Sequence, residues 1–248
     1  MQINNKKVIG IILAYKAAGS LEKLYKSLPM DVLDDVFVSN DETGDGIEQV
    51  AQRLGIKCFS HPRLGYGGNM KYGMKKAIEL GADYMVEIHG DGQYGVDFIK
   101  PAVDKINEGY DLVLGSRFTD ILQPLRDEMS LVRYIANIGL TFLQKIVLRV
   151  RLSELHTGAR VYSSSAISKI DLGSSSDNFL FSFEIIAQFV YKKFRIAEVP
   201  VRCYYGKEHS SISLKASTIY AFNTFGVLYN FIISKLGFKT KLFYEKKN

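Results

Sequence analysis

Short apolar runs alternate with helix-like stretches along the first 116 residues, and this alternation limits the possible folds more than any other feature. Helical patterning is expected for Ser20–Ser27, with Ser20 as its cap, and for Asn69–Leu80. Strands that alternate with helices predict a mostly parallel sheet covered by helices on both faces, which is an α/β fold. The expected strands are Lys7–Ala14, Asp35–Asn40, Ile56–Ser60, Tyr84–Ile88 and Asp111–Ser116.

The pattern changes after Arg117. Residues 119–130 predict an irregular loop, and the last helix, expected over Leu214–Leu236, leads into a lysine-rich tail. We therefore expect one α/β domain over residues 1–213 and an amphipathic C-terminal extension over residues 214–248. Between the loop and the last helix the sequence predicts a long helix, a strand, a helix and a strand: Leu131–Val150, Arg160–Ser163, Phe181–Lys192 and Arg195–Val201.

Composition narrows the classes of partner and compartment. The net charge of +6 favours phosphates, nucleic acid or an anionic membrane surface as partners. We expect no nucleic-acid binding, because no basic stripe with exposed aromatic residues of a known recognition type is present. Cys58 and Cys203 form neither a disulfide framework nor a metal-ligand spacing, which favours a reducing cytosol. The apolar run after Lys7 is too short for a signal peptide.

The stretch from Tyr84 to Tyr94 begins as a buried strand and ends in a polar loop. In an open α/β sheet, ligands bind at the carboxyl edge of the strands, where this loop is expected to lie. The side chains of Asp91 and Gln93, with Gly92 between them, offer oxygen ligands of the kind that suit Mg²⁺ or Mn²⁺. An ordinary polar turn without a ligand is the alternative.

Other strand ends carry groups that suit a nucleoside diphosphate. Carboxylate and amide edges suit a base and a ribose, while a cation and a guanidinium suit the phosphates. The glycines of Gly65–Gly68 permit close backbone approach to a ligand. Because the carboxyl ends of parallel strands share one edge, we expect these groups to converge: Ala14, Tyr15, Asn40, Asp41, Ser116 and Arg117.

The ordered set of motifs resembles the inverting family-two glycosyltransferases of GT-A fold, and within them the dolichyl- and polyprenyl-phosphate sugar synthases. The resemblance covers roughly residues 7–213 and implies a Rossmann-like sheet, a nucleotide-sugar donor and a divalent metal. It identifies residues 40–46 with the nucleoside loop, 64–68 with the glycine loop, 89–93 with the Asp-x-Asp-x-Gln metal motif, and 115–117 with Gly-Ser-Arg. It also identifies residues 154–160 with the Asp-x-x-Ser-Gly-x-Arg element, and 183–185 and 197–201 with later blocks.

The sequence departs from this family at two places. The Pro-x-Tyr-Asn-Glu segment at the first strand end is replaced by Leu13–Ala17, so the ribose-facing acid is missing. His89 stands in place of the first metal-motif Asp. We expect His89 to face the ligand or to support the site, with the metal held by Asp91 and Gln93.

The resemblance, with the residues, gives a set of candidate roles. The candidate nucleotide-binding residues are Ala14, Tyr15, Asn40, Asp41, Gly67, Gly68, His89 and Gly90, and the candidate catalytic residues are Asp91, Arg117, Glu154, His156 and Arg160. If the acceptor is a sugar hydroxyl, it needs a general base, for which Glu154 is the candidate. A lipid phosphate is already an anion, which Arg160, Arg202 and Lys207 would position. Structural alternatives remain open: an ion pair of Glu154 with Arg151, and one of Arg160 with Glu184.

The expected reaction is inverting sugar transfer from a GDP- or UDP-sugar to a polyprenyl phosphate at the cytoplasmic membrane face. Basic residues interleaved with apolar ones in Leu131–Arg151, together with the apolar last helix, predict peripheral docking on an anionic leaflet. Packing of these helices on the sheet is the alternative, and a homo-oligomer stays open. A transferase that extends a saccharide acceptor and a catalytically silent nucleotide-sugar-binding module are the competing functions.

Overall fold

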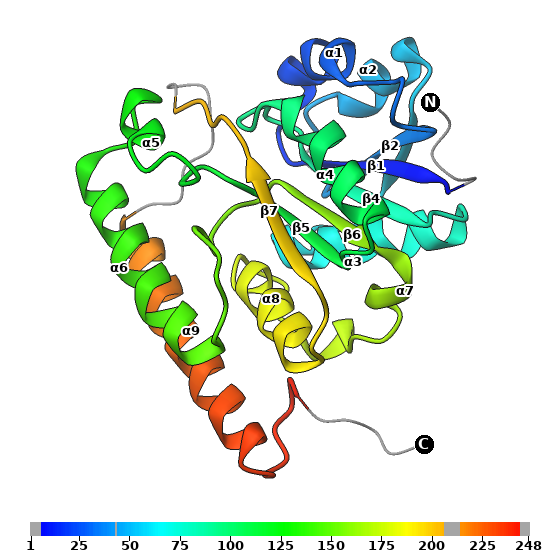
Figure 1. Ribbon diagram of the computed structural model, residues 1–248. Helices are drawn as coiled ribbons and strands as arrows, with labels where there is room; N and C mark the ends of the chain where they lie inside the picture. Colours follow the sequence, from blue (N-terminus) through cyan, green and yellow to red (C-terminus); the bar gives the residue numbers. More distant parts are fainter. Residues whose placement is uncertain (1–5, 43, 206–213, 244–248) are drawn as a thin grey trace.

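The computed structural model describes residues 6–42, 44–205 and 214–243, and its centre is one seven-stranded sheet with the order β3-β2-β1-β4-β6-β5-β7 (Figure 1). Neighbouring strands are parallel except at β6, which runs antiparallel to β4 and β5. The predicted α/β class is confirmed. The strands are β1 (Val8–Ala14), β2 (Asp35–Asn40), β3 (Lys57–Ser60), β4 (Tyr84–His89), β5 (Leu112–Ser116), β6 (Arg160–Ser163) and β7 (Ile196–Pro200).

Alternation of side chains along the strands creates two hydrophobic layers. On β1, Ile9 and Ile11 face one layer, whereas Val8 and Ile12 face the other, as the two-residue period of a strand requires. Both layers need a helical cover because all seven residues of β1 are buried.

Helices from different parts of the chain cover the two faces (Figure 1). One face packs against α1 (Ala18–Ser27), α2 (Ile47–Leu54) and α4 (Ile99–Asn107, after the 3-10 turn η1, Val96–Phe98). The other packs against α3 (Gly65–Glu79), α8 (Phe181–Tyr191) and α9 (Leu214–Lys235). The remaining helices are α5 (Gln123–Arg126), α6 (Leu131–Leu148), α7 (Ser164–Ile167) and the 3-10 turn η2 (Leu172–Ser174).

Three local predictions were wrong. Helix α3 begins at Gly65 rather than Asn69, so the expected glycine loop is its first turn. Ser20 lies within α1 and does not cap it; its hydroxyl donates to the Gly90 carbonyl at 2.6 Å. The stretch expected to be irregular contains α5. The predicted boundary at residue 213 lies outside the described residues.

Helices α6 and α9 run side by side at one flank of the sheet (Figure 1). Gln144 Nε2 of α6 donates to Thr224 Oγ1 of α9 at 3.0 Å. Helix α9 also packs on α8 through buried Val227, Leu228 and Phe231. Helix α6 is long and apolar enough to cross a membrane by length and composition, and only 17% of it is buried in the fold. These two helices, called the α6–α9 pair below, present an apolar outer surface.

Candidate functional site

The register of the sheet brings the predicted strand ends together. Ala14 pairs with Asn40, and Leu13 pairs with His89, so the ends of β1, β2 and β4 lie at one edge. Asp91 and Gln93 follow β4 at this edge and are partly exposed. Asp91 Oδ1 accepts a hydrogen bond from the Gln93 N–H at 3.0 Å. The two proposed metal ligands are therefore held in one short turn.

His89 is turned toward the protein interior. Its Nε2 lies 3.4 Å from Glu87 Oε1, is buried, and satisfies hydrogen-bond geometry with no described residue. The ring packs beside Tyr94, with 5.2 Å between ring centroids, and against Gly158, where a Cβ atom would lie 2.2 Å from Nε2. This orientation fits the expectation that His89 supports the site, with the metal held by other residues.

A buried network around Glu87 was not predicted. Glu87 accepts hydrogen bonds from the hydroxyls of Tyr66 and Tyr162, the second at 2.7 Å. Burial raises the pKa of Glu87, but nearby His89 and Arg160 outweigh it, so the pKa is lowered and the carboxylate is charged. A glutamate inside an apolar strand, two residues before His89, was the available signal.

Arg117 and Glu154 form a buried ion pair at the end of β5. The Glu154 carboxylate accepts from the Arg117 backbone N–H at 2.8 Å, from its Nε at 2.9 Å and from its Nη2. Burial lowers the pKa of Arg117, but the Glu154 charge outweighs it and holds that pKa well above its ordinary value. The alternative pairing with Arg151 was wrong. Because Glu154 is fully buried and paired, the structure does not support its predicted role as a free general base.

Arg160 is also inaccessible. Its Nε and Nη2 donate to the Thr157 carbonyl at 2.9 and 2.7 Å, and the side chain is completely buried. Direct contact of Arg160 with an acceptor is therefore corrected to a role in holding the loop before β6. The expected alternative partner, Glu184, instead accepts from Ser176.

Arg202 is held by a carboxylate. Its Nε donates to both oxygens of Asp127 at 2.9 Å, and Gln123 donates to the same carboxylate. Burial raises the pKa of Asp127, but these donors outweigh it and lower the pKa. Arg202 is therefore not the uncommitted phosphate ligand that the sequence predicted. Lys207, its predicted companion, lies outside the described residues.

Asn40 and Asp41 have different environments. Asn40 Nδ2 donates to Ser60 Oγ at 3.0 Å, while its Oδ1 is buried without a partner among the described residues. This oxygen is therefore an unsatisfied acceptor beside the shared strand edge. The Asp41 carboxylate is buried and accepts from the backbone N–H groups of Leu64 and Gly65, so it anchors the start of α3. Its predicted contact with nucleotide stays a prediction.

The glycines of α3 serve internal packing. A Cβ at Gly67 would lie 2.4 Å from the Ser176 carbonyl, and one at Gly68 would lie 2.5 Å from the Leu64 side chain. Both are buried, so their predicted approach to nucleotide is not supported. Tyr15, after buried Ala14, is exposed at the shared edge, with the Arg63 guanidinium 4.7 Å from its ring centre. Sequence reasoning missed Arg63.

His156 connects the site to α9. Its Nδ1 lies 2.9 Å from the Tyr220 hydroxyl, and its carbonyl accepts from Arg117 Nη2 at 3.1 Å. Burial, aided by Arg117 and Arg160, lowers the pKa of His156 to about 3. The ring is therefore neutral near pH 7.

The side-chain oxygens of Asp91 and Gln93 can hold a divalent cation only together with substrate. Among the described residues, no three His, Cys, Asp or Glu side chains form a metal-binding group. A hard cation bound by one or two protein oxygens, with phosphate and water completing its shell, fits this arrangement. Asp91 and Gln93 are the residues that would hold it.

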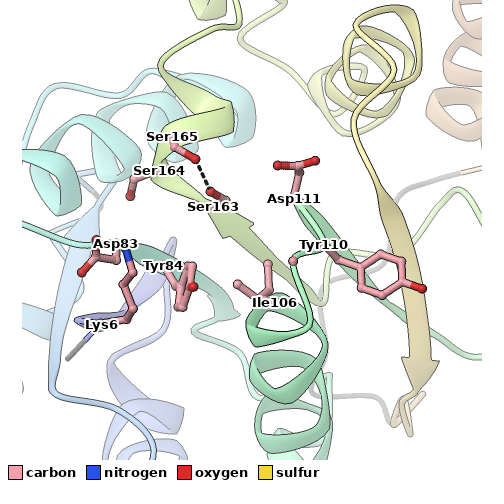
Figure 2. A pocket seen from close by; sticks show the side chains of 10 residues that line it. Lys6, Asp83, Tyr84, Ile106, Tyr110, Asp111, Ser163, Ser164 and Ser165 are labelled. Carbon is pink, nitrogen blue, oxygen red and sulfur yellow. Dashed lines mark hydrogen bonds and ion pairs between the residues drawn. The ribbon is translucent and has the colours of Figure 1, made fainter. Parts of the chain in front are cut away.

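A separate pocket of about 240 Å³ lies at the opposite edge of the sheet, where Figure 2 shows Tyr84, Ile106 and Tyr110 among its lining residues. Its carboxylates are already engaged: Asp83 accepts from the Lys7 N–H, and Asp111 from the Arg195 N–H. It is therefore not part of the candidate site.

The mostly parallel sheet, its helical layers and the polar groups at its carboxyl edge fit a GT-A-type fold. Residues 11–171, more than half of the chain, match the model of glycosyl transferase family 2. The chain belongs to this family, and the protein is a glycosyltransferase, as the sequence predicted.

Relatives and solved structures agree with this assignment. The UDP-N-acetylglucosamine–dolichyl-phosphate N-acetylglucosaminyltransferase of Methanococcus voltae is 25% identical, over 81% of this chain and 87% of that protein. Polyprenol monophosphomannose synthase of Mycolicibacterium smegmatis is 22% identical, over 67% and 65%. Glucosyl-3-phosphoglycerate synthase of Mycobacterium tuberculosis, in complex with Mn²⁺, UDP and product, has a TM-score of 0.67 at 14% identity, over 95% and 82%. This last likeness concerns the fold.

Proposed function

We propose that the protein transfers a sugar, with inversion, from a nucleotide-sugar donor to a polyprenyl phosphate at the cytoplasmic membrane surface. The observation that carries this proposal is the state of Glu154, which is buried and paired with Arg117. A hydroxyl acceptor needs a base to remove its proton, whereas a phosphate is already an anion. The names of the relatives, which specify dolichyl phosphate and polyprenol, support the same acceptor class.

In the proposed reaction, one end of the carboxyl edge of the sheet binds the nucleotide-sugar donor and the other end binds the acceptor. Tyr15 and Asn40 bind the nucleoside, and Asp91 with Gln93 would hold a Mg²⁺ or Mn²⁺ ion, which would supply positive charge to neutralise the leaving diphosphate. A phosphate oxygen of the acceptor forms a bond to the anomeric carbon, while the bond from that carbon to the diphosphate breaks. The nucleoside diphosphate leaves with the electron pair. The other end, after β5 and near Arg117, receives the acceptor anion.

The membrane part of the proposal is supported by the outer surface of the α6–α9 pair. Large apolar side chains are exposed there, including Ile135 and Phe142 on α6 and Phe222 and Tyr229 on α9. The sequence contains no Asp or Glu over residues 129–153 or 214–243, while several Lys and Arg residues flank the apolar positions. Such a surface suits an anionic leaflet.

A donor screen tests the proposal. UDP- and GDP-sugars are offered with Mn²⁺ or Mg²⁺, with and without a short polyprenyl phosphate, and nucleoside diphosphate release is measured. Release that rises sharply with the lipid phosphate is expected. If the same amount of nucleoside diphosphate is released with and without the lipid phosphate, the acceptor is a saccharide. If nucleotide binds but no nucleoside diphosphate is released, the protein is a silent binding module.

A matched pair of variants tests the metal assignment. Asp91→Ala is expected to abolish metal-dependent release while the protein stays folded, because it removes the one carboxylate proposed for the ion. Asp97→Ala, a nearby exposed aspartate, is expected to retain it. Full activity of Asp91→Ala would contradict the assignment.

A further inference from the structure

Both helices of the α6–α9 pair reach the buried Arg117–Glu154 ion pair: α6 contacts Glu154 directly, and α9 contacts His156, whose carbonyl is hydrogen-bonded to Arg117. From α6, Asn137 Nδ2 donates to Glu154 Oε1 at 3.3 Å. From α9, the Tyr220 hydroxyl lies 2.9 Å from His156 Nδ1, and the His156 carbonyl accepts from Arg117. The apolar outer surface and the acceptor end of the site are therefore linked by two side chains.

The Tyr220 contact is the more specific of the two. The rings of His156 and Tyr220 meet edge to face, with 5.5 Å between their centres. The other ring nitrogen of His156, Nε2, is buried and has no hydrogen-bond partner among the described residues. Removal of the Tyr220 hydroxyl would therefore leave both nitrogens of this buried ring unpaired, and the loop that carries the His156 carbonyl would lose its fixed position.

The donor end is anchored by other elements. Asn40 is held by Ser60 of β3, and Asp41 by the start of α3. Neither anchor involves α6 or α9. A change in the seating of the helix pair would therefore reach the acceptor end through direct side-chain contacts, and the donor end only indirectly, through the packing of α8 on α3.

We infer that Tyr220 is a positioning residue which, through His156, couples the seating of the α6–α9 pair on a bilayer to the Arg117–Glu154 pair and so sets the affinity for the acceptor. This inference rests on the proposed function. It predicts a split in kinetic constants, because the Michaelis constant for the acceptor changes and the constant for the donor does not.

The test compares Tyr220→Phe with Tyr25→Phe, which removes a hydroxyl from a partly exposed tyrosine on α1, at the other face of the sheet. On anionic vesicles, Tyr220→Phe is expected to raise KM for the polyprenyl phosphate about fivefold, the effect of one lost hydrogen bond, with an unchanged donor KM. Tyr25→Phe should leave both constants unchanged. In vesicle-free detergent the difference between wild type and Tyr220→Phe should shrink.

The outcomes separate the inference from the proposed function. If the wild-type protein uses a different acceptor, the proposed function is wrong. The inference is then tested with that acceptor, by whether Tyr220→Phe changes the acceptor KM and leaves the donor KM unchanged. A purely structural role of Tyr220 would lower the folded fraction and hence kcat, with both KM values retained. Unchanged acceptor KM, or equal changes for both substrates, would overturn the coupling.

Discussion

At the scale of single residues, the site depends on which neighbours leave room for an unusual side chain. His89 replaces an expected carboxylate, and its ring occupies the space beside Gly158 that any larger residue would need. Gly158 also donates its backbone N–H to the Tyr94 hydroxyl at 3.0 Å. The two positions therefore act as one unit: the imidazole requires the glycine.

Gly158→Ala is expected to lower the free energy of unfolding by about 1–3 kcal/mol, because the new methyl group would overlap His89 Nε2. Urea unfolding measures this loss. In the double variant with His89→Ala the loss should be smaller than the sum of the single losses, because the overlapping ring is gone. Gly139→Ala, at a helical position with open space around it, is the control and should not destabilise. Additive losses would argue against the contact.

His156 predicts a pH dependence of stability. Its pKa falls from an ordinary 6.5 to about 3 in the folded protein, so below pH 6.5 the unfolded chain binds a proton that the folded chain does not. Stability should therefore decrease as pH falls from 6.5 toward 3, by at most about 1.4 kcal/mol per pH unit from this residue. His156→Asn should make the decline between pH 7 and pH 5 less steep in urea unfolding. An identical slope in both proteins would show that His156 is not buried in its neutral form.

At the scale of elements, local sequence patterns predicted which helices and strands exist better than they predicted which residues contact one another. The strands were predicted because apolar runs of four to eight residues flanked by turns can be recognised without tertiary information. The start of α3 was missed because Gly65, Gly67 and Gly68 suggest a loop, whereas tight packing on residues 176–181 requires them within a helix. Tertiary contact overrides local propensity here.

The same limit applies to the site. The strand-end positions of Asn40, Asp91 and Arg117 followed from the α/β pattern. The partner of Glu154 did not, because Arg117 is distant in sequence and Arg151 is nearby, and only the fold brings the first pair together. The burial of Arg160 could not be predicted either, because a single sequence does not tell which charged side chains are buried in the fold.

Helix α6 yields a prediction at this scale. Ile135→Asp places a charge on its outer surface, where the side chain is 61% exposed, so folding stability should change little. Binding to anionic vesicles should fall about tenfold or more, because a buried isoleucine contributes roughly 1.5–3 kcal/mol. Ile78→Asp, an exposed isoleucine on α3, is the control and should bind as wild type does.

Co-sedimentation with vesicles and the molar mass in solution distinguish the two possible covers of this surface. Unchanged binding by Ile135→Asp would contradict docking through α6. A change from dimer to monomer without vesicles would show instead that a second copy covers the helix.

At the scale of the whole molecule, the distribution of charge matters more than its sum. The net charge is +6, and the segments that form and flank the α6–α9 pair supply Lys and Arg without a single Asp or Glu over residues 129–153 and 214–243. The other face of the sheet carries mixed charges, such as the Lys26–Glu22 and Arg53–Glu22 pairs. The molecule is therefore electrically asymmetric, with its basic side where the apolar surface lies.

This asymmetry predicts a salt-sensitive component of membrane binding. Each Lys or Arg near an anionic surface contributes about 1 kcal/mol at low salt, and screening shortens that attraction as ionic strength rises. Binding to anionic vesicles should therefore weaken strongly between about 0.05 M and about 0.5 M salt, whereas the weaker binding to neutral vesicles should hardly change. Ile135→Asp should weaken binding to both kinds of vesicle, because it removes apolar contact that salt does not screen. Salt-independent binding to anionic vesicles would mean that the apolar surface alone holds the protein on the bilayer.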